Sequence, residues 1–340
     1  MEVGILTFRK GGDYAASVCS DVKLHDIGMR TKTVFEKIRA AWRVARASCD
    51  HDFVVSGLEL RTDDIVIGAK LLNALRGAKK KYIATVHVAV LSYPLFLRKR
   101  FGRRWWKAVY SRFDKITAVS QGVAGDVAEL TGVAADKIGI LPGPTDTETL
   151  RLKADEPVDV AEYEPYFVAV GRLEEQKDYP TLITAFHRFL EITGSDHNLL
   201  ILGRGSQESS LRDLVGSLGL SRRVHFPGFV ANPWAYMRRS TALVLSSIYE
   251  GLALVLTEAM ACGTSVIAAD CPYGPKAMIN EARNGYLVEM RDPEEMAQAM
   301  VHVATHPDEA RQKACTASQF VERFSAEHVS RDLQSMLLGL

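Results

Sequence analysis

The sequence contains no apolar run of about 18 residues, the length at which a helix can span a membrane. Its opening residues, MEVGILTFRKGG, lack the basic region, long apolar core and small-residue cleavage site of a secretory signal peptide. The five cysteines are odd in number and have no metal-ligand spacing. They fit the reduced thiols of a cytoplasm better than a disulfide framework. We therefore expect a cytoplasmic protein with no structural metal.

The charge balance conceals a difference between the two halves of the chain. Of 340 residues, 47% are hydrophobic and 24% are charged, which is typical of a globular protein of about two domains. Residues 1–150 contain 24 Lys and Arg against 16 Asp and Glu, whereas residues 151–340 contain 18 against 25, which sums to the net charge of +1. The two halves are therefore expected to face different partners.

Apolar segments of strand length alternate with amphipathic segments of helix length, and no repeat of about 20 to 50 residues is present. Such alternation predicts parallel sheets, here an α/β fold of two Rossmann-like domains. Strands are expected at residues 3–8, 22–27, 53–56, 82–86 and 116–119, and again at 167–170, 199–202, 223–226, 242–245, 265–268 and 285–288.

The helix expected at residues 32–47 places Val34, Ile38, Trp42 and Ala45 on one apolar stripe. The segment 141–157 is rich in Pro, Thr and acidic residues, which is typical of a linker. We therefore predict a first domain at 1–145, a linker at 146–165, a second domain at 166–322 and a closing helix at 323–340 that packs back towards the first domain.

The segment 246–263, SSIYEGLALVLTEAMACG, runs from a strand end through a glycine turn into a helix. Glu250 therefore lies near the carboxyl end of a strand, and Glu258 about two turns into the helix. Helix amino termini at this edge of a parallel sheet bind anions, which indicates a phosphate-bearing ligand. Two solvated carboxylates are the alternative, but the segment is too apolar for an exposed face.

Two further turns are expected at the same sheet edge. Arg172 and Lys177 lie on a strand-to-helix turn, where two cations could bind a diphosphate; two solvated surface cations are the plainer alternative. Gly203 belongs to a lone Gly-x-Gly in LGRGS, which matches neither a dinucleotide fingerprint nor a P-loop. An ordinary tight turn would explain it equally well.

The first half holds two candidate features. His87 ends a strand, where it is either a packed or capping residue or part of a site. Residues 98–112 carry seven Lys and Arg, no acid and interleaved aromatic residues. The residues that would meet an anionic membrane or an acceptor are Arg98, Lys99, Arg100, Arg103, Arg104, Trp105, Trp106 and Lys107. Membrane binding and a core role for Trp105 and Trp106 remain open, and nucleic acid fits less well because the second half is acidic.

Several motifs together resemble one family across nearly the whole chain. They are TVH at 85–87, AVSQGV at 118–123, VGRL and QKD within 170–178, PGFV at 227–230, YEGLALVLTEAMACGTSVIAAD from Tyr249, CPYGP from Cys271 and NGYLVE from Asn284. This combination is similar to the retaining nucleotide-sugar glycosyltransferases of family four. Their fold is GT-B, in which two Rossmann-like domains face a cleft.

The resemblance implies a role for each candidate residue. Glu250 would contact the donor sugar, Glu258 the ribose, and Arg172 and Lys177 the diphosphate, with His87 near the reacting sugar. The donor-binding set would be completed by Gly203, Val230, Gly251, Leu252, Ala253, Leu254 and Val255.

The implied activity is retaining transfer of a hexose or N-acetylhexosamine from a nucleotide-diphosphate sugar, with UDP favoured over GDP. The acceptor would be a glycan or a lipid-linked glycan in cell-surface polysaccharide synthesis, on the inner face of a membrane. The leaving phosphate would take the acceptor proton in a front-face attack, so that no metal, cofactor or protein nucleophile is needed. A non-catalytic nucleotide-sugar-binding or glycan-binding protein and a nucleotide-sugar epimerase of similar fold are the alternatives.

One departure from the family pattern concerns the start of the chain. Family members open with a strand, a glycine-rich loop and a helix before the strand expected here at 3–8. The missing strand is normally central in the sheet, and its loss would expose unpaired backbone edges. We therefore expect a start upstream of Met1 or a truncated form, and a poorly active chain; robust transfer by protein that starts at Met1 would contradict this.

Overall fold

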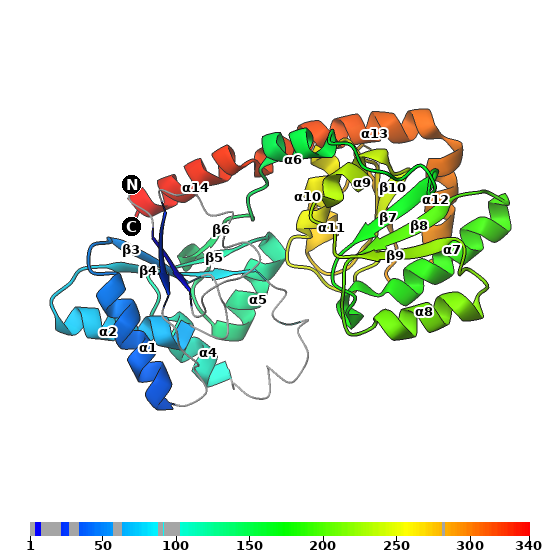
Figure 1. The fold of residues 1–340 in the computed structure, drawn as a ribbon. Coiled ribbons are helices and arrows are strands. Elements are labelled where there is room, and N and C mark those ends of the chain that lie inside the picture. The colour runs from blue at the N-terminus through cyan, green and yellow to red at the C-terminus, as the bar shows by residue number, and fades with distance from the viewer. Residues whose placement is uncertain are drawn as a thin grey trace. The chain divides into compact units, whose positions relative to one another are not determined.

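The structure is a computed structural model. It describes residues 4–7, 22–26, 34–56, 63–87, 91, 103–280 and 283–340. The chain divides into two compact units (Figure 1). Unit 1 comprises Met1–Val119, Val123–Ile140 and Leu338–Leu340, and unit 2 comprises Ser120–Gly122 and Leu141–Leu337. Within the described ranges, no helix combines the length and hydropathy needed to cross a bilayer.

Unit 1 is built on short parallel strands. Four of them form a sheet in the order β3-β4-β5-β6, and two more form a separate parallel pair, β1-β2. Their bounds are β1 Gly4–Thr7, β2 Lys23–Asp26, β3 Phe53–Ser56, β4 Lys81–Val86, β5 Lys115–Ala118 and β6 Ile138–Ile140. The helices are α1 Val34–Ala47, α2 Asp63–Leu75, α4 Arg103–Tyr110 and α5 Gln121–Thr131. Helices α1, α2 and α4 lie on the same side of the four-stranded sheet (Figure 1).

Helix α1 is turned away from the orientation that its sequence predicts. Its buried side consists of Ala40, Ala41, Val44 and Ala45, which pack against α2. Ile38 and Trp42, which were expected on the buried stripe, are 60% and 44% exposed, so that expectation is wrong for both. The reason is a close helix approach: a Cβ at Gly68 of α2 would lie 3.0 Å from the Cβ of Ala41. Small side chains permit this approach, and Ile or Trp would prevent it.

Unit 2 contains one six-stranded parallel sheet in the order β12-β11-β10-β7-β8-β9. The strands are β7 Tyr166–Val170, β8 Asn198–Leu202, β9 Val224–Gly228, β10 Ala242–Leu245, β11 Val266–Ala269 and β12 Tyr286–Val288. The helices are α6 Thr147–Ala154, α7 Tyr179–Thr193, α8 Glu208–Ser217, α9 Pro233–Arg239, α10 Leu254–Ala261, α11 Gly274–Met278, α12 Pro293–Thr305, α13 Pro307–Phe320 and α14 Ala326–Leu338. Apart from α9 and α11, the alternation of strand and helix is the one that the sequence predicts.

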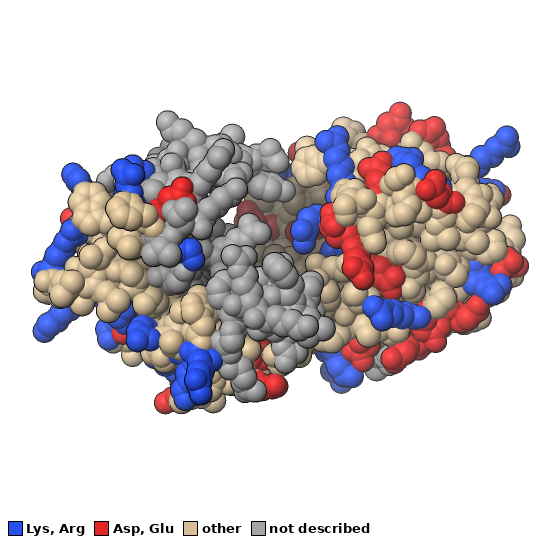
Figure 2. Space-filling view, turned by 90° about the horizontal axis from the view of Figure 1, so that it is seen from below, with Lys and Arg blue, Asp and Glu red and all other residues tan. Residues whose placement is uncertain are grey.

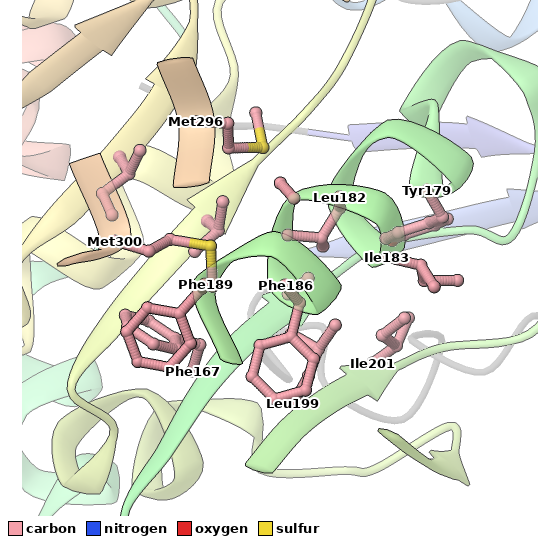
Figure 3. Close-up of a cluster of buried hydrophobic side chains, with 14 of the residues drawn as sticks. Phe167, Tyr179, Leu182, Ile183, Phe186, Phe189, Leu199, Ile201, Met296 and Met300 are labelled. Carbon is pink, nitrogen blue, oxygen red and sulfur yellow. The ribbon is translucent and has the colours of Figure 1, made fainter. Parts of the chain in front are cut away.

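The main core of unit 2 lies where α7, α8 and α12 cover the sheet (Figure 3). Phe167 on β7 meets Phe189 on α7 edge to face, with the ring centroids 5.2 Å apart. Phe186 stacks beside Phe189 at 6.0 Å, and Met296 and Met300 of α12 close the cluster. Large apolar side chains from helix and sheet therefore hold the strands, and hence the strand ends, in fixed positions.

The segment predicted to be a linker, 146–165, is partly helical. Asp146 caps α6 by accepting a hydrogen bond from the Thr149 N–H at 3.1 Å. Helix α6 packs against α9 and α10 and belongs to unit 2. The short helices α9 and α11 were not predicted from the sequence. At the end of the chain, Leu338–Leu340 groups with unit 1 and the rest of α14 with unit 2.

Candidate functional site

Two glycine turns meet at the carboxyl ends of β7 and β8. The Gly171 N–H donates to the Leu202 carbonyl at 3.0 Å, and the Gly203 N–H donates to the Gly228 carbonyl at 2.8 Å. Gly203 has a φ of 147°, and a Cβ there would lie 1.9 Å from the Gly171 carbonyl oxygen. Only glycine allows these turns to touch, so the Gly-x-Gly signal has a structural cause at this sheet edge.

The central polar contact joins Lys177 to Glu250. Lys177 ends the short 3-10 helix η3, Glu175–Lys177, and Glu250 follows β10. The Lys177 Nζ lies 2.6 Å from Glu250 Oε1, and their side chains are only 15% and 10% exposed. The Ser247 hydroxyl donates to the same Oε1 at 2.7 Å. An ion pair and a second hydrogen bond thus compensate for burial of the carboxylate.

Hydrogen bonds to main-chain carbonyl groups hold the loop that carries Glu250 against η3. The Ile248 N–H donates to the Gln176 carbonyl at 2.9 Å, and the Gln176 amide donates to the Tyr249 carbonyl at 2.8 Å. The Ser246 hydroxyl donates to the Lys177 carbonyl at 2.6 Å. These hydrogen bonds hold the segments that carry Lys177 and Glu250 next to each other, so the geometry of the ion pair does not depend on its two flexible side chains alone.

The same loop leads into α10 through a strained residue. Ala253, at the N-cap, has φ 60° and ψ 59°, a left-handed conformation that costs a non-glycine residue of order 1 kcal/mol. No side chain caps α10, and its first turn contains no acidic residue. Gly251, Leu252 and Ala253 are buried, whereas Leu254 is 42% exposed. This helix start is of the kind that binds anions in proteins.

Glu258 differs from Glu250 in its surroundings. The indole N–H of Trp234, on α9, donates to Glu258 Oε2 at 3.3 Å. Burial raises the pKa of the Glu258 carboxyl, an effect that the Trp234 hydrogen bond and the Lys177 charge oppose. The two carboxylates that the sequence singles out are therefore distinct: one is ion-paired and the other is poorly compensated.

Two buried thiols lie near these carboxylates. Burial raises the pKa of Cys271 to about 12, with the Glu250 charge as a further cause. Burial likewise raises the pKa of Cys262 to about 12, and Glu258 adds to it. Both cysteines are thus neutral at pH 7, and neither is suited to be a nucleophile.

The other residues predicted for the donor site are dispersed over unit 2. Arg172 is exposed on the turn after β7, Val230 lies two residues beyond β9, and Val255 is partly buried in α10. His87 follows β4 in unit 1 and is exposed. An ion pair thus brings together Lys177 and Glu250, and the charge of Lys177 also acts on Glu258.

The basic segment of unit 1 is described only in part. Arg98, Lys99 and Arg100 lie outside the described residues, and the side chain of Arg103 is not described. In α4, Arg104 and Lys107 are exposed and Trp105 is partly buried. Trp106 is 2% exposed and packs against Tyr110, with ring centroids 5.5 Å apart. The expectation that Trp106 meets a membrane or an acceptor is therefore wrong, since this indole belongs to the core.

Three polar residues of the site were missed from the sequence: Gln176, Ser247 and Trp234. Ser247 is fully buried at the end of an apolar strand, which is a recognisable signal for a satisfied polar partner. Gln176 and Trp234 gave no such signal, because their partners lie 73 and 24 positions away along the chain.

Family models match both halves of the chain. The model described as glycosyl transferases group 1 matches residues 151–318, and the model described as glycosyltransferase family 4 matches residues 2–149.

Among curated relatives, the chain is 29% identical over 231 residues to an N-acetylgalactosaminyltransferase of Campylobacter jejuni that acts on N-acetylgalactosamine-N,N'-diacetylbacillosaminyl-diphospho-undecaprenol. It is 28% identical over 236 residues to the lipopolysaccharide 1,6-galactosyltransferase of Salmonella typhimurium. Each alignment covers 68% of this chain and 62% of the relative, so the chain spans less than two thirds of these relatives.

Solved structures share the fold. The Anabaena protein HepE in complex with UDP and glucose has a TM-score of 0.82 at 16% identity, over 99% of this chain and 92% of that one. A glycosyltransferase from Rickettsia africae has a TM-score of 0.78 at 18% identity, over 98% and 88%. The chain belongs to the group 1, family four glycosyltransferases and has their GT-B fold.

Proposed function

We propose that the chain transfers a hexose or N-acetylhexosamine from a nucleotide-diphosphate sugar, UDP-linked by preference, to a glycan or lipid-linked acceptor, with retention of configuration. The observation that carries the proposal is the buried Lys177–Glu250 pair, 2.6 Å apart, directly before the uncapped start of α10. The pair places a cation beside an anion at one sheet edge, and from Glu250 the chain continues into the start of α10 at Leu254. A charged diphosphate and a sugar hydroxyl need these groups.

In this proposal each group acts on a different part of the donor. As the glycosyl–phosphate bond breaks, negative charge grows on the diphosphate, and Lys177, Arg172 and the α10 N-terminus stabilise it without a metal ion. Glu250 accepts a hydrogen bond from the sugar, and Glu258 accepts hydrogen bonds from the ribose. The leaving phosphate takes the acceptor proton in a front-face attack. His87 contributes near the reacting sugar.

The named relatives favour this class of substrate. The Campylobacter relative acts on an undecaprenol-linked saccharide, and the Salmonella relative acts on lipopolysaccharide. The structural neighbour of Anabaena binds UDP and glucose. We carry these properties to the present chain as a proposal for surface-glycan synthesis on the inner face of a membrane, with no role for nucleic acid.

Glu250→Gln tests the catalytic role. Transfer by wild type is first measured as UDP or GDP release from a panel of nucleotide sugars, with a lipid-linked acceptor and without it, and UDP affinity by calorimetry. We expect Glu250→Gln to lower turnover by about 100-fold to 1,000-fold, because a group that contacts the reacting sugar is lost. The matched control is Glu191→Gln, which removes an exposed carboxylate on α7 that pairs with Arg188.

Other outcomes would replace the proposal. Equal turnover of Glu250→Gln and wild type would remove the assigned role. UDP binding by wild type without transfer to any acceptor would favour a non-catalytic binding protein, and a sugar-nucleotide isomer formed without acceptor would favour an epimerase.

A further inference from the structure

The outward side of α1 carries an unusual set of residues. Six exposed positions follow the helical spacing i, i+3, i+4, i+7, i+8 and i+11. We call them the α1 outer stripe: Phe35, Ile38, Arg39, Trp42, Arg43 and Arg46. The three apolar members are 77%, 60% and 44% exposed, in chain order. Large apolar side chains and arginines thus alternate along one exposed line.

Packing among the described residues of unit 1 does not account for these apolar side chains. Helix α1 already buries its opposite side through Ala40, Ala41, Val44 and Ala45 against α2. A single exposed apolar residue is common on protein surfaces. Three large ones on a single helical stripe form a patch of the kind that marks an interaction surface.

The positive charge of the α1 outer stripe indicates an anionic partner. It contains three arginines and no Asp or Glu, within a half of the chain that has a surplus of eight positive charges, 24 against 16. The Arg46 guanidinium lies over the Trp42 ring, 5.6 Å from its centroid. Arginine beside indole and phenyl groups suits the headgroup layer of an anionic membrane, where cations meet phosphates and rings enter the interface.

We propose that the α1 outer stripe binds the surface of an anionic lipid bilayer, with α1 lying in the plane of the interface. The helix has 14 residues, hence a length of about 21 Å, and the stripe runs along most of it. Arg104 and Lys107 of α4 are also exposed, and α4 lies on the same side of the sheet as α1 (Figure 1). Figure 2, which is seen from below, shows Lys and Arg side chains of unit 1 interspersed with uncharged residues.

This binding extends the proposed function, since a lipid-linked acceptor lies in such a membrane. It does not require that function, because lipid binding is measured without sugar transfer. A protein that binds lipid through the α1 outer stripe but transfers no sugar would support lipid binding and refute the proposed function. A protein that transfers sugar but does not bind lipid would support the proposed function and refute lipid binding.

The test is co-sedimentation with two kinds of vesicle: phosphatidylcholine alone, and phosphatidylcholine with about 30% phosphatidylglycerol. One variant combines Phe35→Ala, Ile38→Ala and Trp42→Ala, and a second combines Arg39→Gln, Arg43→Gln and Arg46→Gln. The matched control is Leu152→Ala with Ile192→Ala, two apolar residues of unit 2 that are 69% and 50% exposed.

We expect wild type and the control to bind only the anionic vesicles. Each α1 variant should bind these vesicles at least about tenfold more weakly. For the arginine variant the reason is that each arginine near an anionic surface raises the affinity about fivefold. The apolar variant should keep its helical circular dichroism because Ala favours helix. Should it unfold, the arginine variant still decides the matter, because it leaves the apolar residues in place.

Three results would overturn the proposal: full binding by both α1 variants, equal binding of wild type to neutral vesicles, or a wild-type dimer that both variants dissociate in light scattering. The last result would identify a second copy of the chain as the partner of the stripe.

Discussion

Unit 2 and unit 1 use the same parallel strand–helix alternation but place their large apolar residues differently. In unit 2 the strands β8, β10 and β11 are buried at every position, and rings from α7 fill the space above the sheet. In unit 1, α1 is buried through alanines and a valine, while Phe35, Ile38 and Trp42 face outward. Unit 2 therefore uses its apolar residues to hold strand ends in place, and unit 1 leaves some on its surface for a partner.

The largest expected effect tests whether the two cores are independent. Phe189→Ala removes a fully buried ring from α7, and we expect unit 2 to lose about 3–5 kcal/mol of unfolding free energy. The matched variant in unit 1 is Phe113→Ala, where the ring is 1% exposed beside Tyr110. Scanning calorimetry should show each variant lowering one thermal transition only. A common shift of all transitions would mean that the units unfold together.

A second prediction concerns the glycine turns on which the site of unit 2 is built. Gly203→Ala places a Cβ 1.9 Å from a backbone oxygen at a φ of 147°, so we expect a loss of roughly 2–3 kcal/mol. Gly216→Ala in α8 meets nothing within 4 Å and should stabilise the helix by up to about 1 kcal/mol. Urea denaturation of the pair measures both values. Equal stability of the two variants would show that the turns can relax apart.

The smallest expected effect concerns Glu258, a largely buried carboxyl group of the site that lowers the stability of unit 2 at pH 7. Burial raises the pKa of Glu258, so the folded state binds the carboxyl proton more tightly than the unfolded state does. The protonated carboxyl therefore stabilises the folded state at pH values below the ordinary pKa of 4.5. This stabilisation is lost as the pH rises through the pKa of the folded state. Glu258→Gln keeps an acceptor for Trp234 and removes the charge. We therefore expect the variant to be more stable than wild type at pH 7, by up to about 1 kcal/mol, and to bind UDP more weakly.

Denaturation curves between pH 4 and pH 8 check the sign of this effect. The advantage of Glu258→Gln should shrink as pH falls towards 4.5. A variant that is less stable than wild type across the whole range would show that the carboxylate is better compensated than its burial indicates.

Much of the fold follows from local sequence signals. The strands of unit 2 were predicted because short apolar runs ended by glycine or polar residues have few other uses. Glu250 was identified because it follows such a strand and precedes an apolar helix. Arg172 and Lys177 were recognised by the turn that carries them, but the 2.6 Å contact between Lys177 and Glu250 joins residues 73 positions apart and was not predictable from spacing.

The sequence by itself determined the alternation of strands and helices, the position of the sheet edge that carries Glu250, and the opposite charges of the two halves. These depend on residue type and local spacing. Only the tertiary structure decided that α1 buries Ala41 and exposes Trp42, that Trp106 belongs to the core, and that Glu258 meets Trp234. Periodicity shows which residues can share a face, whereas the fit of that face to its neighbour, here the close approach of Ala41 to Gly68, decides which face is buried.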